Sequence, residues 1–309
     1  MADEKKRIDE PTGTALKGHE WDGIQELDTP MPRWWVWTFY LTIIWALGYV
    51  ILYPAWPMLE SATKGLLGWS SRGQLTQELK AQDNKRAAMH SAIAATPAAD
   101  LPRHPALMQA AIEGGRSAFK VYCVQCHGSG AAGAKGYPNL NDDDWLWGGD
   151  LPTIQQTLIH GVRQPGDDAT RFSQMPAFGR DQLLDGRAIT DVTAYVRTIS
   201  GQEQPSQAAK RGATVFANNC AVCHGPAGKG DRQFGAPNLI DAIWLYGGDA
   251  QTIAATVTNS RFGVMPSWNT KLDPVTIKML AAYVHSLGGG ENAPALPELA
   301  QKDEADVQP

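Results

Sequence analysis

The chain has few cysteines and no excess of charge of either sign. Only four of its 309 residues are cysteine, and they form two identical pairs, which disfavours a small secreted scaffold held by many disulfides. Its 27 lysines and arginines are balanced by 32 aspartates and glutamates, for a net charge of -5. Because a non-specific nucleic-acid binder needs a basic surface, we expect no nucleic-acid partner.

Charged residues and histidines are also missing from a stretch near the N-terminus, 34–59. From Trp34 to Tyr53, only two threonines and one glycine fall outside the hydrophobic set. Twenty residues of helix rise about 30 Å, the thickness of the hydrocarbon core of a bilayer. Aromatic residues lie at both ends, and Pro54 stops the helix. The sequence therefore predicts a retained transmembrane anchor at 34–56, because no small-residue cleavage site follows it.

One segment occurs twice in the rest of the chain. Each copy contains a glycine, a phenylalanine four residues later, and then Cys-x-x-Cys-His-Gly at identical spacing. Further on come Pro-Asn-Leu, Trp-Leu-aromatic-Gly-Gly-Asp, Met-Pro, and an apolar helix with Ala-Tyr-Val. The matching pairs are Gly115 and Gly212, Phe119 and Phe216, Cys123 and Cys220, Pro138 and Pro237, Trp145 and Trp244, Met175 and Met265, and Tyr195 and Tyr283. This repetition predicts two small helical domains, joined by a linker at 200–207.

The Cys-x-x-Cys-His motif is the attachment pattern of a c-type haem. A zinc ribbon needs its second cysteine pair about 15–20 residues after the first, whereas here the second pair lies in the other repeat. A thioredoxin-like dithiol needs a βαβ context, which is missing. We therefore expect two covalently attached haem c groups, with thioether bonds to Cys123, Cys126, Cys220 and Cys223 and axial histidines His127 and His224.

The sixth ligand of each iron is predicted to be a methionine. Met175 and Met265 occupy the same place in the two repeats, and each is followed by proline. Axial His/Met ligation raises the reduction potential and closes the iron to small molecules, which suits electron transfer and opposes catalysis at the haem. We therefore expect no catalytic residue. His160 and His285 do not correspond to each other in the repeats, but His160 remains an alternative to Met175 at the first iron.

The whole pattern resembles class I cytochrome c. In that family, the carbonyl of a proline after the haem motif accepts a hydrogen bond from the axial histidine, a role that the resemblance gives to Pro138 and Pro237. The N-terminal and C-terminal helices of the fold also cross each other. The resemblance implies one crossing formed by Gly115, Phe119 and Tyr195, and another formed by Gly212, Phe216 and Tyr283.

The segment Gly18–Trp35, which leads into the anchor, indicates a more specific family. It is similar to the corresponding segment of the dihaem subunit family of cbb3-type cytochrome c oxidase, CcoP or FixP, and the similarity extends to about Leu287. The family implies a non-catalytic electron-transfer subunit in a respiratory enzyme complex. Its haems take electrons from a donor cytochrome c and pass them to a monohaem cytochrome c subunit. That subunit feeds the catalytic haem-copper subunit, which reduces oxygen and pumps protons.

Two other kinds of protein share parts of this pattern. A membrane-anchored dihaem cytochrome that shuttles electrons among several partners has similar repeats, but it does not require the Gly18–Trp35 segment. A dihaem peroxidase needs one iron that can open, which two matched Met-Pro positions oppose. The shuttle is therefore the alternative function.

The expected fold class is mainly α, with one N-terminal transmembrane helix followed by two class I cytochrome c-like all-α domains in tandem. Lysines and arginines flank the anchor evenly, but c-type haem is attached outside the cytoplasm. We therefore expect a single pass through the bacterial inner membrane, in contact with lipid, with the N-terminus cytoplasmic and the haem domains periplasmic. The expected parts are an N-terminal segment 1–33, an anchor 34–56, a linker 57–105 with a possible helix at 74–92, a first repeat 106–200, a second repeat 201–290, and a flexible acidic tail 291–309 that begins to unpack at Gly288.

Acidic residues gather at two places in the first repeat, 142–144 and 167–168. Such a surface attracts a basic donor cytochrome, with an effect that weakens as salt rises. The alternative is a solvated acidic loop. The candidate docking residues are Asp142, Asp143, Asp144, Asp167 and Asp168.

Overall fold

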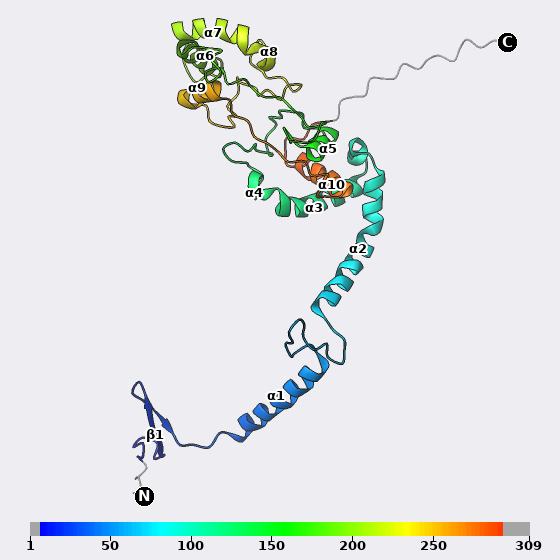
Figure 1. Cartoon of the computed structure of the whole chain (residues 1–309), viewed down its shortest axis with the longest axis vertical. Helices are drawn as coiled ribbons and strands as arrows, with labels where there is room; N and C mark the ends of the chain where they lie inside the picture. The colour runs from blue at the N-terminus through cyan, green and yellow to red at the C-terminus, as the bar shows by residue number, and fades with distance from the viewer. Residues whose placement is uncertain (1–6, 293–309) are drawn as a thin grey trace, which may run out of the picture. The chain divides into compact units, whose positions relative to one another are not determined.

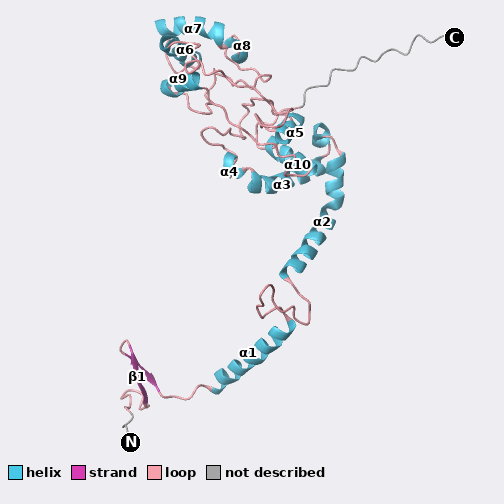
Figure 2. Ribbon diagram, viewed as in Figure 1, coloured by secondary structure: helices cyan, strands magenta, loops and turns pink. Residues whose placement is uncertain are grey.

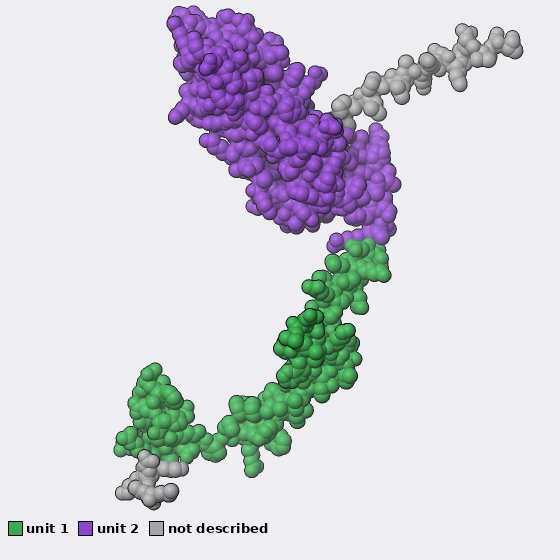
Figure 3. Space-filling model, in the orientation of Figure 1, with its two compact units in different colours: residues 1–85 green, residues 86–309 purple. Residues whose placement is uncertain are grey.

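The computed structural model describes residues 7–292 and divides the chain into two compact units, 1–85 and 86–309 (Figure 3). Helices dominate both units (Figure 2), which confirms the expected mainly α fold. Each unit is described separately below.

Unit 1 begins with a β-hairpin that the sequence analysis missed. Strands β1, Leu16–Trp21, and β2, Ile24–Leu27, pair antiparallel, with Trp21 opposite Ile24. The turn is Asp22-Gly23, and both residues have positive φ, 50° and 83°. Such a turn strongly favours a two-residue hairpin, so Asp-Gly was the signal that could have predicted it.

The predicted anchor is helix α1, Arg33–Leu52 (Figure 1). Among the described residues, it is the one helix long and apolar enough to cross a membrane. Tyr53 still donates its amide to Tyr49 O at 2.8 Å, and Pro54 then ends the pattern, as expected. The following loop turns back onto the helix end, where Leu66 N donates to Ile51 O at 3.0 Å.

Helix α2, Ser71–Ala95, covers the helix expected at 74–92 and passes from unit 1 into unit 2. Its last turns pack into unit 2 together with the 3-10 helix η1, Ala98–Arg103, and Ile93 is fully buried there. The buried Lys278 ammonium donates to the carbonyls at the end of α2, those of Ile93, Ala94 and Thr96, at 2.6–3.0 Å. A lysine at this position satisfies carbonyls that have no partner within the helix.

Unit 2 contains the two repeats. The helices of the first are α3, Pro105–Tyr122; α4, Val124–His127; α5, Leu151–His160; and α6, Gly186–Ile199. Those of the second are α7, Gln207–Asn219; α8, Ala221–His224; α9, Ala250–Asn259; and α10, Pro274–His285. The final aspartate of each Gly-Gly-Asp motif caps the next helix: Asp150 accepts from Thr153 N at 3.1 Å, and Asp249 accepts from Thr252 N at 2.9 Å.

The predicted helix crossings are wrong, because the repeats exchange their terminal helices. Helix α3 of the first repeat packs on α10 of the second, and α6 packs on α7. At the first crossing, a Cβ on Gly115 would overlap Met279 O and lie 2.7 Å from Tyr283 Cβ. At the second, a Cβ on Gly212 would overlap Asp191 O. Each glycine thus allows close contact between two backbones, but the partner helix belongs to the other repeat.

A short linker explains the exchange. Only seven residues, 200–206, separate the end of α6 from the start of α7. A connection of this length favours antiparallel packing of the two helices that it joins. Once α7 covers the apolar face of α6, the matching face of α3 is left for α10. The two 90-residue segments therefore do not each close on themselves, although they follow each other in tandem along the chain.

Two apolar cores result, and each contains residues from both repeats. The first core comprises Ile93, Leu101, Phe119, Cys123, Leu151, Ile154, Leu158, Ile277 and Leu280, with Trp145, Met265 and Tyr283 packed against it. The second core comprises Phe178, Ile189, Val192, Val196, Phe216, Cys220, Ile253 and Val257, with Met175, Tyr195 and Trp244 packed against it. Each core thus holds one haem motif together with one of the two candidate methionines.

The start of the C-terminal tail is packed, contrary to prediction. Gly289 O accepts a hydrogen bond from Trp145 Nε1 at 2.6 Å, and the Glu291 carboxylate pairs with Arg232, with one contact at 2.9 Å. Acidic composition alone predicts an unpacked segment, but Gly289 O and the Glu291 carboxylate each have a partner. The rest of the tail, 293–309, lies outside the described residues.

Candidate functional site

The Cys-x-x-Cys-His motifs have the same local conformation in both repeats. Cys123 ends α3, and its carbonyl accepts from the amides of Cys126 at 3.2 Å and of His127 at 2.9 Å. Cys220 makes the corresponding bonds at 3.1 and 2.9 Å. One tight helical turn therefore holds two thiols and an imidazole next to one another in each repeat.

No disulfide joins the four cysteines, which all lie within the described residues, and their surroundings oppose a redox-active dithiol. Cys123 and Cys220 are buried, whereas Cys126 is exposed and Cys223 is half-buried. Burial, and to a smaller extent the paired cysteine, raises the pKa of Cys123 and of Cys220 to about 11. A nucleophilic cysteine needs a lowered pKa, so these thiols are poor redox catalysts and fit a structural or covalently modified role.

Each histidine of the motif is oriented by a proline carbonyl, as the resemblance to class I cytochrome c predicted. His127 Nδ1 lies 3.2 Å from Pro138 O, and His224 Nδ1 lies 3.0 Å from Pro237 O. A carbonyl can only accept, so Nδ1 carries the proton and Nε2 keeps its lone pair for a metal. Burial lowers the pKa of both histidines and so favours the neutral, ligating form.

The methionines belong with the opposite motifs from those expected. The backbone of Met265 pairs with Val162 in the first repeat, through bonds of 2.9 and 3.0 Å, and its side chain packs on the core that contains Cys123. Met175 O accepts from Ser260 Oγ at 2.6 Å, and its side chain packs on the core that contains Cys220. The structure therefore packs Met175 on the core of the second motif and Met265 on that of the first, because the exchanged helices carry their methionine loops with them.

His160, the alternative ligand at the first iron, already has a partner. Its Nδ1 lies 3.1 Å from the Asp167 carboxylate, whose side chain is only 16% exposed. The pair lies in an insertion of the first repeat, because Met175 follows Asp150 by 25 positions whereas Met265 follows Asp249 by only 16. In this insertion, Arg163 donates to Gly263 O at 2.7 Å and to Ser173 O at 2.9 Å. The insertion thereby connects the segments that precede both methionines.

The residues in each core fit a c-type haem. Each motif provides two neighbouring thiols for covalent attachment and an imidazole with Nε2 free, and each apolar core provides a thioether from the other repeat. This donor set, in an apolar setting, is the one that His/Met-ligated haem c uses.

One repeated arrangement escaped the sequence analysis. An arginine lies four residues before each methionine, within an Arg-Phe-x-x-Met-Pro pattern. Arg171 lies over the Trp147 ring at 5.5 Å, and Arg261 lies over the Tyr246 ring at 5.6 Å. Comparing the repeats upstream of Met-Pro would have revealed the pattern, although not the stacking.

The acidic run at 142–144 is partly buried. Asp142 and Asp144 are half-buried, and only Asp143 is exposed. Burial, followed by the negative charges of Asp241 and of its acidic neighbours, raises the pKa of Asp144 to about 6. Of the five aspartates considered for donor docking, Asp143 and Asp168 are thus the exposed ones.

Known proteins match almost the whole chain. A family model for the N-terminal domain of cytochrome oxidase-cbb3, FixP, matches residues 13–60, and one for cytochrome c oxidase, cbb3-type, subunit III, matches residues 110–196 and 207–284. The cbb3-type cytochrome c oxidase subunit CcoP of Cereibacter sphaeroides is 53% identical over 287 residues, which cover 93% of this chain and 98% of the relative. Subunits named FixP from Bradyrhizobium sp. and Azorhizobium caulinodans are 53% and 52% identical, over 94% and 92% of this chain and 100% and 96% of the relatives.

Proposed function

Because the chain belongs to the CcoP/FixP family of cbb3-type cytochrome c oxidase subunits, we propose that it transfers electrons through two haem c groups. The chain is an electron-transfer subunit of the oxidase, and the number of haems and their ligands are our proposal. The observation that carries it is that each core contains the first cysteine of a Cys-x-x-Cys-His motif and has a methionine of the other repeat packed against it.

The proposed ligands are exchanged between the repeats. Cys123 and Cys126 would hold the first haem through thioether bonds, and His127 and Met265 would ligate its iron. At the second haem, the corresponding residues are Cys220, Cys223, His224 and Met175. A bound haem c supplies one reversible Fe(II)/Fe(III) couple. The chain's own groups orient the imidazole and favour its neutral form, and they pack apolar side chains against the methionine.

The proposed electron path runs from a donor cytochrome c, through the two haems, to the monohaem subunit and then to the catalytic haem-copper subunit. The exposed Asp143 and Asp168 are the candidate docking charges for a basic donor. Since exposed charges are screened by salt, reduction by the donor should slow as ionic strength rises.

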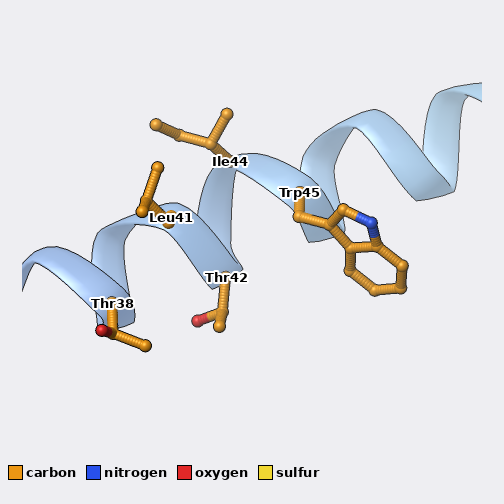
Figure 4. A pocket seen from close by; sticks show the side chains of 5 residues that line it. All are labelled: Thr38, Leu41, Thr42, Ile44 and Trp45. Atoms are coloured by element: carbon orange, nitrogen blue, oxygen red, sulfur yellow. The ribbon is translucent and has the colours of Figure 1, made fainter. Parts of the chain in front are cut away.

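We further propose that α1 crosses the bacterial inner membrane once, with residues 1–33 in the cytoplasm and the haems in the periplasm. Thr38, Thr42 and Trp45 share one face of the helix (Figure 4). The threonine hydroxyls donate to Trp34 O at 2.9 Å and Phe39 O at 2.7 Å, so neither is left unpaired in lipid. Thr38 and Thr42 are small side chains four residues apart, so a neighbouring helix can approach closely at this point. This supports contact with another oxidase subunit on this face.

A difference spectrum of the complex isolated in mild detergent through a tag on this chain tests the proposal. We expect c-type bands together with b-type bands and a response to carbon monoxide, because the tagged chain brings the oxygen-reducing subunit with it. The control is that the membranes still consume oxygen before extraction. If the isolated chain then shows only low-spin c-type bands and no response to carbon monoxide, the membrane-anchored shuttle is favoured instead.

A further inference from the structure

Two aromatic rings cross between the repeats inside unit 2. Trp147 and Tyr246 occupy the same position in the two Trp-Leu-aromatic-Gly-Gly-Asp motifs. A Cβ on Gly235 would overlap the Trp147 ring, and a Cβ on Gly136 would lie 3.3 Å from Cε1 of Tyr246. Each ring therefore lies against a glycine of the other repeat, at a place where a side chain would not fit without displacing it.

The Trp147 ring contacts both segments that lead to the proposed ligands of the second haem. Gly235, under the ring, lies two residues before the proline whose carbonyl orients His224 at 3.0 Å. Arg171, at 5.5 Å from the ring centre, lies four residues before Met175. One ring thus connects the histidine side and the methionine side of this site.

The Tyr246 ring makes the reciprocal contacts at the first haem site. Gly136 lies two residues before the proline that orients His127 at 3.2 Å, and its amide donates to the carbonyl next to Tyr246, that of Leu245, at 2.9 Å. Arg261 lies 5.6 Å from the ring centre and four residues before Met265. Equivalent residues of the two repeats thus make equivalent contacts at the two sites.

The loop that carries each ring packs on one core, whereas the ring itself contacts the ligand segments of the other haem site. Trp145, two residues before Trp147, packs on the first core, which contains Cys123, whereas Trp244 packs on the second core, which contains Cys220. Each ring therefore connects a loop anchored at one haem site to the ligand segments of the other. Aromatic packing and cation–π stacking of this kind hold such a connection rigidly.

We propose that Trp147 and Tyr246 are positioning residues for electron transfer between the two haems. They fix the separation and relative orientation of the sites, on which the transfer rate depends. One electron leaves Fe(II) at one site and reduces Fe(III) at the other, so no bond forms or breaks and no further reactant is needed. The inference rests on the ligand sets proposed above.

The test uses the purified oxidase with Trp147→Leu, Tyr246→Leu and the conservative Trp147→Phe. The readouts are haem content, the Met–iron absorption band, the reduction potential of each haem, and the rate of inter-haem equilibration after rapid reduction. We expect both leucine variants to keep two haems and the Met–iron bands. Equilibration should slow about tenfold or more, and the potentials should shift, because small displacements of redox partners have large effects on rate. The phenylalanine variant should retain most of the wild-type rate.

A pair of glycine variants separates ring displacement from backbone strain. Gly235 and Gly166 both have positive φ, 55° and 79°, but a Cβ on Gly166 would meet no atom within 4 Å. Gly235→Ala should therefore slow equilibration, and Gly166→Ala should not. Equal slowing of inter-haem equilibration in the two glycine variants would overturn the inference and leave the ligand sets intact. Unchanged rates and potentials in the two leucine variants would do the same. A wild-type oxidase without two Met-ligated haems would overturn the ligand sets and the inference together.

Discussion

Folding changes the pKa of the Asp144 carboxyl group. Its pKa is about 6, above the ordinary 3.8, because it is half-buried near Asp241 and its acidic neighbours. Between these two pH values the folded state holds a proton that the unfolded state releases. This residue's contribution to stability is therefore present below about pH 4 and is lost as pH rises through 6.

We predict that Asp144→Asn stabilises the protein at pH 7 and has little effect near pH 4. With allowance for solvent screening at a half-exposed site, the expected gain in the free energy of unfolding is about 1 kcal/mol. Denaturant unfolding of the haem-loaded protein at both pH values measures it. Asp143→Asn makes the same charge change at an exposed neighbour whose charge contributes less than burial to the raised pKa of Asp144, so its gain at pH 7 should be smaller. An Asp144 variant no more stable than wild type at pH 7 would contradict this account.

The roles of single residues at the haem motifs could largely be predicted from the sequence. The resemblance to class I cytochrome c predicted that the Pro138 carbonyl orients the His127 ring, and these two residues lie only eleven positions apart in the chain. The stacking of Arg171 on Trp147 could not be predicted in this way, because it depends on how distant loops meet. The raised pKa of Asp144 likewise depends on Asp241, which lies in the other repeat.

At the scale of elements, each helix crossing depends on a glycine. A Cβ on Gly115 would overlap Met279 O, so Gly115→Ala must push α3 and α10 apart. We predict a loss of about 1–3 kcal/mol in the free energy of unfolding. Gly186→Ala at the start of α6 is the matched control, because a Cβ there would meet no atom within 4 Å. Denaturant titration of both variants measures the difference.

The same glycine also tests which helix is the partner. If α3 packs on α10, the effects of Gly115→Ala and Tyr283→Ala should be non-additive by at least about 0.5 kcal/mol, because the residues are in contact. The effects of Gly115→Ala and Tyr195→Ala should add, because Tyr195 packs with Phe216 at the other crossing. Coupling to Tyr195 in place of Tyr283 would mean that each repeat closes on itself.

Helix positions could be predicted, but helix partners could not. The apolar periodicity around Ala-Tyr-Val predicted α6 and α10. The absence of charge predicted α1, which begins one residue before the expected anchor, 34–56, and ends four residues before its end. Two similar repeats, however, present similar apolar faces, so α3 fits either α6 or α10 equally well by pattern. The length of the 200–206 connection decides between them, which a reading of each repeat alone does not reveal.

At the scale of the whole molecule, the N-terminal hairpin is the feature that implies assembly. Trp21 and Ile24 lie opposite each other on β1 and β2 and are 69% and 70% exposed. An exposed apolar pair on a small hairpin is better explained by a protein partner than by folding of the hairpin itself.

We predict that deleting residues 18–32 reduces recovery of the catalytic subunit with this chain, because it removes most of the hairpin. The haem content of the chain should not change, since both haem motifs lie in unit 2. Co-purification from membranes measures recovery, and Trp21→Ser with Ile24→Ser should act in the same direction without shortening the chain. Full recovery of the complex after the deletion would refute a docking role for this segment.

The exchange of methionine ligands between the repeats is the central claim, and one measurement tests it most directly. In a variant that retains only the first haem, Cys220→Ser with Cys223→Ser, the Met–iron absorption band is recorded after Met265→Ala and, separately, after Met175→Ala. We predict that the band disappears with Met265→Ala and persists with Met175→Ala, because Met265 packs on the core that contains Cys123. Loss of the band with Met175→Ala and its persistence with Met265→Ala would contradict the exchanged arrangement.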